Sequence, residues 1–457
     1  MKPSTFLSLP FTKSLSLFFF SLLCGSFLNA QPDPYQVRRD KLIEKTNKEL
    51  IILVNSGGQD YYSESSQNVN FYYLTGISTA DAVLVVDGKN GKSAIYRRAR
   101  PWGPPEEAPA GIELKATEDL AKDLPRLMAG SPVIWMEMGQ LKLLEQAGFS
   151  LNRLEAIRNV TPLINGMRPV KDELETGRIK KAAHITALGL VEAMKATEPG
   201  MNEKDVELIL DYTWKKLGST GIGFGSIIGS GPNSTIIHYS TNTRTMQPGD
   251  LVVTDVGAEM DYYTADITRT FPVSGKFTKE QKEIYDIVLK TQKAAIEAMQ
   301  PGNSVNDVHK AITRNLNQGL YELGLITDTT QAWQNSIWII HGWGHHIGLA
   351  VHDVAGITVP GKPEVLEPGM IYTVEPGLYF PEKHLERDFT RMRNVTEEQW
   401  KAFLEKVEPL FKKYVNIGVR IEDDVLITPS GNEIITGEVP KEIADIEALM
   451  KQKSKFN

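Results

Sequence analysis

The sequence predicts an α+β fold in which a larger C-terminal region, built from two similar halves, follows a smaller α/β domain. Two internal sequence similarities indicate the two halves. Asp255 and Glu375 each end an apolar run at the same distance after a Pro-Gly pair. The pairs Pro199-Gly200 and Pro301-Gly302 each follow an alanine-rich helical stretch and precede an Asp-Val pair. Weak duplication of this kind predicts two halves with a pseudo-two-fold relation, each giving two carboxylates to a central site.

The first predicted element is a secretory signal peptide, residues 1–30. Lys2 and Lys13 supply positive charge, residues 15–28 are apolar, and Ala30 is the small residue of a cleavage site. The apolar segment is too short for a membrane span, which needs about 20 residues, so no stable membrane insertion is expected. We expect export to a bacterial periplasm; a retained anchor, secretion and lipid attachment at Cys24 are the alternatives. Cys24 is the only cysteine, so the mature chain has no disulfide.

The second predicted element is the smaller domain, residues 31–165. Its strand-like runs 83–87 and 93–97 flank a Gly-Lys-Asn-Gly turn, 132–136 is a further strand, and helical stretches lie between. A long helical pattern near 174–197 then begins, so the boundary lies just before it and the C-terminal region is 166–457. The net charge of −7 has both signs interspersed, which predicts no surface for nucleic acid.

A β-hairpin is the next predicted element. Two β-branched and aromatic runs flank a short polar turn around Met260-Asp261. If the turn is centred there, Asp255 and Asp266 lie symmetrically about it and face each other. Facing carboxylates destabilise a strand pair unless they share a cation or a proton. The alternative is that both are unrelated surface aspartates.

The remaining site residues lie further along the chain. Strand alternation in 418–428 puts Arg420 and Glu422 on one face. Four of the eight histidines fall within 341–352, and none precedes residue 184. His341 and His345 are four apart, but the glycines around them disfavour a helix, so a glycine-rich loop or strand that approaches a ligand is predicted. Histidine is the commonest metal ligand and general acid–base group.

These motifs together resemble the pita-bread metallopeptidases, and within them aminopeptidase P. The motifs are Asp-x-Gly-x-Glu with a second Asp eleven residues later, His-Gly-x-x-His before Gly-Leu-x-Val-His-Asp, Thr-Val-Glu-Pro-Gly-Leu-Tyr, and Val-Arg-Ile-Glu-Asp-Asp. They cover about 168–435. Residues 70–76 and 81–86 are similar to the N-terminal domain that accompanies aminopeptidase P and prolidase, so the resemblance spans nearly the whole mature chain.

The resemblance implies a pita-bread catalytic domain with five metal ligands. Asp255 and His345 each serve mainly one metal, Asp266 and Glu422 bridge the two, and Glu375 binds a metal while it acts on the attacking water. A site of four carboxylates and one imidazole favours two Mn²⁺ ions, with Zn²⁺ or Co²⁺ possible by intrinsic affinity. Two such cations lower the pKa of a bridging water, so that hydroxide is available at neutral pH.

The resemblance also implies a second layer of catalytic residues. His238 and His352 match positions that contact the substrate and shuttle protons, and His341 matches one that lines the same pocket. Arg420 and Tyr379 match a pair that supports the metal cluster and orients the peptide. For each of these residues the alternative to a catalytic role is a structural one, as a buried side chain that only makes hydrogen bonds. His346 and His384 match no functional position.

The implied activity is that of an Xaa-Pro aminopeptidase, which releases the N-terminal residue from peptides with proline in second position. Prolidase, which cleaves only dipeptides ending in proline, is the alternative with the same chemistry, and an inactive peptide-binding homologue is the alternative of a different class. Residues 381–414 form a longer connection than expected for a bacterial aminopeptidase P, either a solvated surface helix or a flap that limits substrate length. The N-terminal domain implies a homo-oligomer, a dimer or tetramer.

Overall fold

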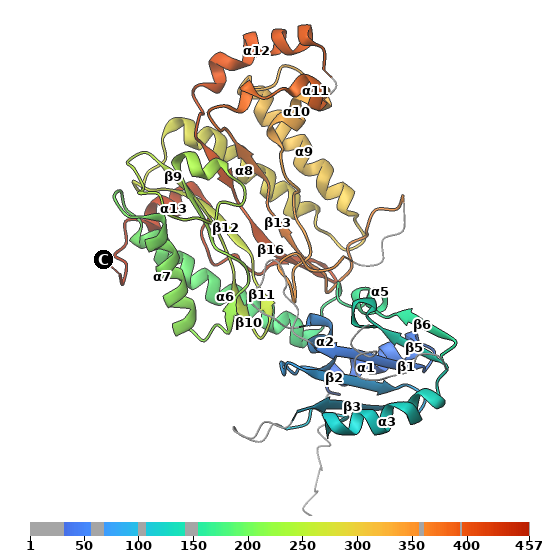
Figure 1. The fold of residues 1–457 in the computed structure, drawn as a ribbon. Helices are drawn as coiled ribbons and strands as arrows, with labels where there is room; N and C mark the ends of the chain where they lie inside the picture. Colours follow the sequence, from blue (N-terminus) through green and yellow to red (C-terminus); the bar gives the residue numbers. More distant parts are fainter. Residues whose placement is uncertain are drawn as a thin grey trace, which may run out of the picture.

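The computed structural model describes residues 32–55, 68–98, 107–141, 154–355, 361–393 and 395–456. The predicted signal peptide, with Cys24, lies outside the described residues. Figure 1 shows the smaller N-terminal domain, coloured blue to cyan, against one end of the larger C-terminal region. No described helix is long and apolar enough to cross a membrane.

The N-terminal domain is a six-stranded mixed sheet with helices packed around it. The strand order is β4-β3-β2-β1-β5-β6. The strands are β1 (Leu50–Asn55), β2 (Ala82–Asp87), β3 (Lys92–Arg97), β4 (Ile112–Ala116), β5 (Val133–Met136) and β6 (Ala156–Asn159). The helices include α1 (Pro34–Lys45), α2 (Val69–Thr75), α3 (Thr117–Ala129) and α5 (Thr161–Asn165). The predicted strands at 83–87, 93–97 and 132–136 are confirmed as β2, β3 and β5.

Four long helices frame the C-terminal region: α6 (Glu173–Ala196), α7 (Glu203–Lys216), α8 (Lys279–Ala298) and α9 (Val305–Glu322). The predicted helix near 174–197 is α6, which begins at a capping box between Asp172 and Glu175. Helix α6 packs on β10, β11 and β12, whereas α8 packs on β13, β14 and β15. Each half therefore lays one of its helices on its own strands.

The strands of the first half are β7 (Gly221–Ile222), β8 (Ile227–Ser230), β9 (Leu251–Val256), β10 (Ala258–Met260), β11 (Tyr263–Thr264) and β12 (Ile267–Pro272). Those of the second half are β13 (Ile371–Val374), β14 (Gly377–Tyr379), β15 (Gly418–Arg420), β16 (Asp423–Thr428) and β17 (Gly431–Ile434). The three-stranded sheets β12-β9-β8 and β13-β16-β17 form the centre of the two halves.

The predicted duplication of the C-terminal region is confirmed in detail. Both helix pairs are joined by a Pro-Gly link, and α7 and α9 each begin with a capping box, at Asn202 and Ser304. The amides of Gly200 and Gly302 donate to the carbonyls of Met246 and Leu366, both at 2.9 Å, in the segments that lead into β9 and β13. Asn202 and Ser304 also form matching β-bridges. The same local contacts therefore recur in both halves.

The connection 381–414 contains η4 (His384–Glu386), α11 (Phe389–Arg393) and α12 (Glu397–Phe411). Figure 1 shows α11 and α12 beside α10 (Ala332–Trp338), at the end of the molecule away from the N-terminal domain. The buried residues of α12 are Phe403, Val407 and Phe411, which join the main hydrophobic core. Helix α12 is thus packed through one face, and its charged residues are exposed.

Polar and aromatic contacts join the two domains. Arg38 of α1 is buried and pairs with Asp172 at 2.6 Å and Glu175 at 3.3 Å. Tyr72 of α2 packs against Tyr262, in the turn between β10 and β11, with ring centroids 4.6 Å apart. One hydrophobic cluster includes residues of both domains. The N-terminal domain therefore contacts both the start of α6 and the turn of the hairpin that carries Asp255 and Asp266.

Candidate active site

The hairpin that carries the first two aspartates exists, but its predicted register is wrong. β9 and β12 are antiparallel, and Asp255 lies opposite Thr268 rather than Asp266. The turn is formed by Asp261 and Tyr262, which have φ of 49° and 68°. Asp266 is two residues before Thr268, so it lies on the same face as Asp255 and diagonal to it. The two carboxylates still converge on one cavity, Asp255 from β9 and Asp266 from the position directly before β12.

The second half supplies two carboxylates from equivalent places. Glu375 directly follows β13 and Glu422 directly precedes β16, and the last paired residues of these strands are Val374 and Asp423. The hydroxyl of Thr268 donates to Glu422 Oε2 at 2.5 Å, and Arg420 Nε donates to the same hydroxyl at 3.2 Å. Arg420 and Glu422 therefore both bond to the Thr268 hydroxyl, as expected for side chains on the same face of a strand.

The histidine segment 341–352 is the glycine-rich, non-helical segment that was predicted, and it runs beside β13. The amide of Thr373 donates to the His345 carbonyl at 2.9 Å, and the amide of His345 donates to the Thr373 hydroxyl at 3.1 Å. A Cβ atom at Gly344 would collide with the Thr373 carbonyl oxygen. Glycine is needed there because the two backbones approach so closely.

The orientation of His345 suits a metal ligand. Its Nδ1 lies 3.1 Å from the carbonyl oxygen of His346, which can only accept, so Nδ1 carries the proton. Nε2 then keeps its lone pair and lies 3.7 Å from Asp266 Oδ2 and 3.6 Å from Glu375 Oε1. The ligand atoms of Asp266, His345 and Glu422 all lie within 4.8 Å of one another.

Burial and crowding shift the acid–base properties of this cluster. Burial raises the pKa of Glu375 to about 8, and the nearby Asp255 carboxylate adds to the increase. Burial, followed by the charge of Glu422, raises the pKa of Asp266 well above its usual range. Burial and the charge of Glu375 do the same to the pKa of Glu422. Burial and the neighbouring His352 lower the pKa of His345 to about 4, so it is neutral at pH 7.

These residues fit divalent cations. Four carboxylates share the site with one guanidinium, that of Arg420, which is paired with Asp255. Asp255 Oδ1 and Asp266 Oδ1 are buried and find no hydrogen-bond donor among the described residues. Buried carboxylate oxygens are normally hydrogen-bonded or bound to a cation. Oxygen-rich sets with one imidazole are ligands that Mn²⁺ and Zn²⁺ accept.

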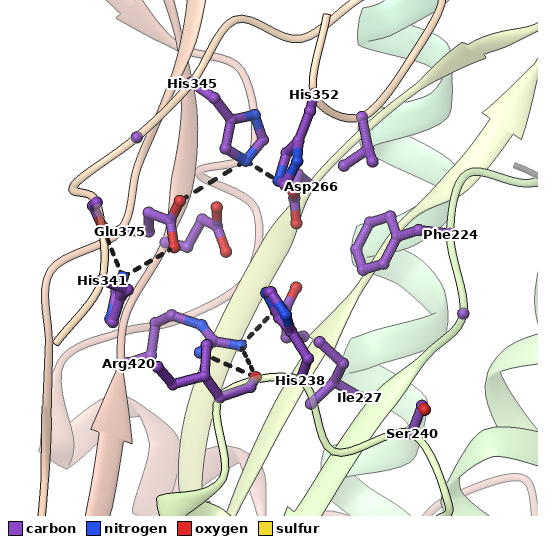
Figure 2. A pocket seen from close by; sticks show the side chains of 17 residues that line it. Phe224, Ile227, His238, Ser240, Asp266, His341, His345, His352, Glu375 and Arg420 are labelled. Atoms are coloured by element: carbon purple, nitrogen blue, oxygen red, sulfur yellow. Dashed lines mark hydrogen bonds and ion pairs between the residues drawn. The ribbon is translucent and has the colours of Figure 1, made fainter. Parts of the chain in front are cut away.

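The carboxylates open into a cavity of about 780 Å³. Of the predicted second-layer residues, His238, His341, His352 and Arg420 line it. Tyr379 is buried and contacts Arg420 and His341. Figure 2 shows His345, His341 and Glu375 on one wall and Phe224 and Ile227 on the opposite one. One side of the cavity is thus acidic and imidazole-rich, whereas apolar side chains lie on the other side together with His238 and Ser240.

A directed chain of hydrogen bonds orients His341. Arg420 Nη1 donates to the Tyr379 hydroxyl at 2.9 Å, and this hydroxyl lies 3.0 Å from His341 Nε2. His341 Nδ1 lies 2.6 Å from the Gly342 carbonyl oxygen, so Nδ1 carries the proton and Nε2 accepts from Tyr379. Arg420 also contacts the carbonyl oxygen of Ile237, at 3.4 and 3.5 Å. Arg420 and Tyr379 therefore hold both His341 and the segment that contains His238.

Several site residues were not found from the sequence. One of them is Thr268, which connects Arg420 to Glu422. Strand alternation places Thr268 on the same face as Asp266, and this pattern could have identified it. The apolar wall, Phe224, Ile227 and Val351, has no motif that could identify it.

His346 and His384, to which no function was assigned, are buried. They bond to Glu364 at 3.1 Å and to the Ile337 carbonyl oxygen at 2.9 Å. None of the described residues that line the cavity comes from the connection 381–414, which gives the flap interpretation no support.

Two family models match this chain. The model of metallopeptidase family M24 matches residues 177–429, and the model of the aminopeptidase P N-terminal domain matches residues 35–103. The first contains all five predicted metal ligands, and the second contains β1 to β3 of the N-terminal domain.

Curated proteins and solved structures resemble the chain over most of its length. The Xaa-Pro aminopeptidase of Haemophilus influenzae is 36% identical, over 84% of this chain and 88% of its own length. The Xaa-Pro aminopeptidase of Escherichia coli is 32% identical, over 91% and 97%. The solved structure of the aminopeptidase PepP of Pseudomonas aeruginosa is 30% identical and superimposes with a TM-score of 0.78, over 91% of this chain and 97% of that one.

Proposed function

This chain belongs to metallopeptidase family M24, and on that premise we propose that it is an Xaa-Pro aminopeptidase. It releases the N-terminal residue from peptides that have proline in second position. The observation that carries the proposal is the convergence of four carboxylates and one neutral imidazole from both halves on a cavity that also has an apolar patch, Phe224, Ile227 and Val351. Relatives at 32–36% identity that carry the same name support it.

The proposed ligands of two divalent cations are Asp255, Asp266, His345, Glu375 and Glu422. When bound, such cations polarise the scissile carbonyl and lower the pKa of a water molecule. We propose Mn²⁺ as the physiological ion because most of the donor atoms are carboxylate oxygens. Metal analysis of the protein isolated from its own cells tests the identity of the ion.

The chain's own residues supply the remaining chemistry. Glu375 takes the proton of the attacking water and returns it to the departing proline nitrogen, since its carboxylate lies at the cavity wall beside His345 and His341. His352 and His238 line the same cavity and donate to the peptide carbonyl groups. Arg420 and Tyr379 fix His341 without touching the reacting atoms. The apolar wall excludes water and suits the proline ring, which has no N–H to satisfy.

One feature favours an aminopeptidase over a dipeptidase. An enzyme restricted to dipeptides needs a free cation near the site to bind the substrate's terminal carboxylate. Arg420 is the only Arg or Lys among the described residues that line the cavity. Its guanidinium is already committed to Asp255, Tyr379 and Thr268. No lining cation is therefore left for a dipeptide's carboxylate, and longer peptides are the expected substrates.

Three peptides test the proposed function in the presence of Mn²⁺. They are an Xaa-Pro dipeptide, an Xaa-Pro-Yaa-Zaa tetrapeptide and an Xaa-Ala-Yaa-Zaa control. Release of the first residue from the proline tetrapeptide, with the alanine peptide cleaved far more slowly, supports an Xaa-Pro aminopeptidase. Cleavage of the dipeptide alone would make the protein a prolidase. Tight binding of the tetrapeptide without cleavage of any peptide would make it an inactive homologue.

The cellular setting is part of the same proposal. Residues 1–30 direct export to the periplasm, and the mature enzyme forms a homo-oligomer. Cell fractionation and N-terminal sequencing of the mature protein test export, and light scattering of the purified enzyme tests its assembly. Recovery of the uncleaved protein in the cytoplasm would contradict the first statement, and a monomeric mass would contradict the second.

A further inference from the structure

Residues 236–244, the His238 loop, contain no helix or strand although they form part of the cavity wall. Ile237, His238 and Ser240 all line the cavity. The loop connects η3 (Gly231–Thr235) to the segment before β9, so no strand ladder holds it in place. Its shape must therefore be fixed by side-chain contacts.

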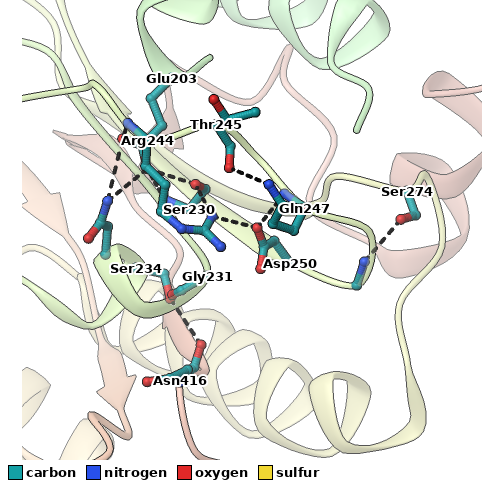
Figure 3. A network of polar contacts seen from close by, with 12 residues as sticks. Glu203, Ser230, Gly231, Ser234, Arg244, Thr245, Gln247, Asp250, Ser274 and Asn416 are labelled. Carbon is teal, nitrogen blue, oxygen red and sulfur yellow. Dashed lines mark hydrogen bonds and ion pairs between the residues drawn. The ribbon is translucent and has the colours of Figure 1, made fainter. Parts of the chain in front are cut away.

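Glu203, the first residue of α7, provides these contacts. Its side chain is fully buried. Its Oε1 accepts from the Ser230 amide and hydroxyl, both at 2.7 Å, and from Asn233 Nδ2 at 3.1 Å. Its Oε2 accepts from the Tyr239 hydroxyl at 3.0 Å and the Arg244 amide at 2.9 Å. Figure 3 shows Glu203 above Ser230 and Arg244 in this network. One carboxylate thus ties the segment before the loop to the loop's far end.

Within the part of the chain that the structure describes, no cationic side chain forms an ion pair with this carboxylate. The Arg244 guanidinium points elsewhere, with Nη1 2.8 Å from Ser230 Oγ and 2.5 Å from Asp250 Oδ2. Glu203 is instead held by neutral donors at the start of a helix, where the helix dipole favours a negative charge. The arrangement depends on the number and direction of the donors, so it fixes the loop's geometry more closely than one ion pair would.

The second half has no carboxylate at the equivalent position, the first residue of α9. Val305 is the first residue of α9, as Glu203 is of α7. Their amides make matching bonds, to the carbonyls of Glu364 and Arg244, both at 3.0 Å. The fold of a half therefore does not require a carboxylate here. The carboxylate occurs in the half whose loop forms the cavity wall with His238.

We propose that Glu203 is a positioning residue for peptide hydrolysis. It holds the His238 loop so that His238 faces the cavity, and it does not touch the substrate itself. Arg420, which contacts the Ile237 carbonyl oxygen, meets the same loop from the metal side. This inference rests on the proposed function, because His238 acts only if a peptide occupies the cavity.

The Glu203→Gln substitution tests the inference because no orientation of the amide fits. Each carboxylate oxygen accepts from a backbone amide, that of Ser230 or that of Arg244, and neither amide can turn away. The NH₂ group of glutamine must face one of them, which places two donors against each other. The variant keeps the size of the side chain and disturbs one end of the loop.

The experiment measures kcat/KM for the Xaa-Pro-Yaa-Zaa peptide and the bound metal per chain. The proposal predicts that Glu203→Gln lowers kcat/KM by between about tenfold and a hundredfold, as small misplacements of positioning groups do, with metal content unchanged. In a His238→Ala background the same substitution should cost less than about twofold, because its effect passes through His238. Asp205→Asn, an exposed neighbour in the same helix start, is the matched control and should leave kcat/KM unchanged.

Wild-type kcat/KM in Glu203→Gln, or the full loss repeated in the His238→Ala background, would overturn the inference. Hydrolysis by the wild-type protein separately decides the proposed function. If Glu203→Gln does not fold, Tyr239→Phe removes one donor only and is expected to lower kcat/KM about threefold, a loss absent in the His238→Ala background. An unchanged value in Tyr239→Phe would count against the inference.

Discussion

The imidazole rings of His345 and His352 lie edge to face, with centroids 4.1 Å apart and planes at 68°. His345 points its Nε2 at the carboxylates, whereas His352 faces the cavity. We therefore propose different roles for these two histidines of one segment: His345 binds a metal ion, and His352 contacts the peptide.

His352→Ala should keep the metal and lose rate. The carboxylates and His345 remain, while loss of a general acid–base group typically lowers kcat by about 10²–10⁴-fold. Metal analysis and kcat for the proline tetrapeptide check this. His309→Ala, in which an exposed histidine of α9 is removed, is the control and should behave as wild type. A His352→Ala enzyme with undiminished kcat would remove His352 from the catalytic residues.

Asp266→Asn should lose metal and activity together. The substitution keeps the shape of the side chain but removes the charge that neighbours His345 and Glu422. We expect less than one ion per chain at saturating Mn²⁺ and a fall in activity of at least about 10²-fold. Asp261→Asn, at the exposed turn of the same hairpin, is the matched control, since asparagine tolerates its positive φ. Full metal content in Asp266→Asn would contradict the assigned ligand role.

A buried ion-pair cluster should matter for stability. Asp353, next to His352, pairs with Arg168 and with Lys171 at 3.5 Å, and Arg168 Nη1 donates to Asn70 of the N-terminal domain at 3.0 Å. Asp353→Ala leaves two buried cations without their carboxylate, which costs about 3–5 kcal/mol. Calorimetry should show a clearly lower unfolding temperature.

The control for the ion-pair prediction is Asp119→Ala, which breaks an exposed pair with Lys122 on α3. Such pairs contribute little, so its unfolding temperature should equal that of wild type. Equal unfolding temperatures for Asp353→Ala and Asp119→Ala would show that the buried cluster is not important for stability.

Metal should stabilise the protein more at higher pH. In the metal-free fold the pKa of Glu375 is raised to about 8 from its usual 4.5, so folding takes up a proton between these values. Stability of the metal-free protein therefore falls as pH rises across this range. Cations that hold the carboxylates ionised remove this penalty.

The increase in unfolding temperature on adding Mn²⁺ should thus be larger near pH 8 than near pH 6. The Glu375→Gln substitution should make this increase depend less on pH, because it removes one of the groups that titrate. A metal-induced increase that is equal at both pH values, or larger at the lower one, would refute this linkage.

Much of the fold could be predicted because local signals and tertiary structure agree. The Pro-Gly links and the capping boxes at Asn202 and Ser304 are each encoded within a few residues, and their recurrence in the second half reveals the duplication. The hairpin register could not be predicted. Its turn uses Asp261 and Tyr262 at positive φ, which tyrosine rarely adopts, and packing of Tyr262 on Tyr72 of the other domain stabilises it.

Part of the candidate site could be predicted from the sequence, and part could not. The convergence of Asp255, Asp266, His345, Glu375 and Glu422 on one cavity could be predicted, because charged residues beside apolar strands stand out in the sequence. The role of Glu203 could not be predicted, because two of its partners, Tyr239 and Arg244, lie in a segment without regular structure, and their positions depend on the folded path of the loop. The apolar wall at Phe224 and Ile227 carries no distinguishing signal, since apolar side chains are common in any core.

Titration of the metal-free enzyme with Mn²⁺, with initial rates on the Xaa-Pro-Yaa-Zaa peptide measured at each step, tests the central claim most directly. The account predicts no measurable cleavage without metal and a rate that reaches its maximum only as the second ion per chain binds. Full activity in the thoroughly metal-free protein would contradict it, and so would a rate that does not respond to the first two equivalents.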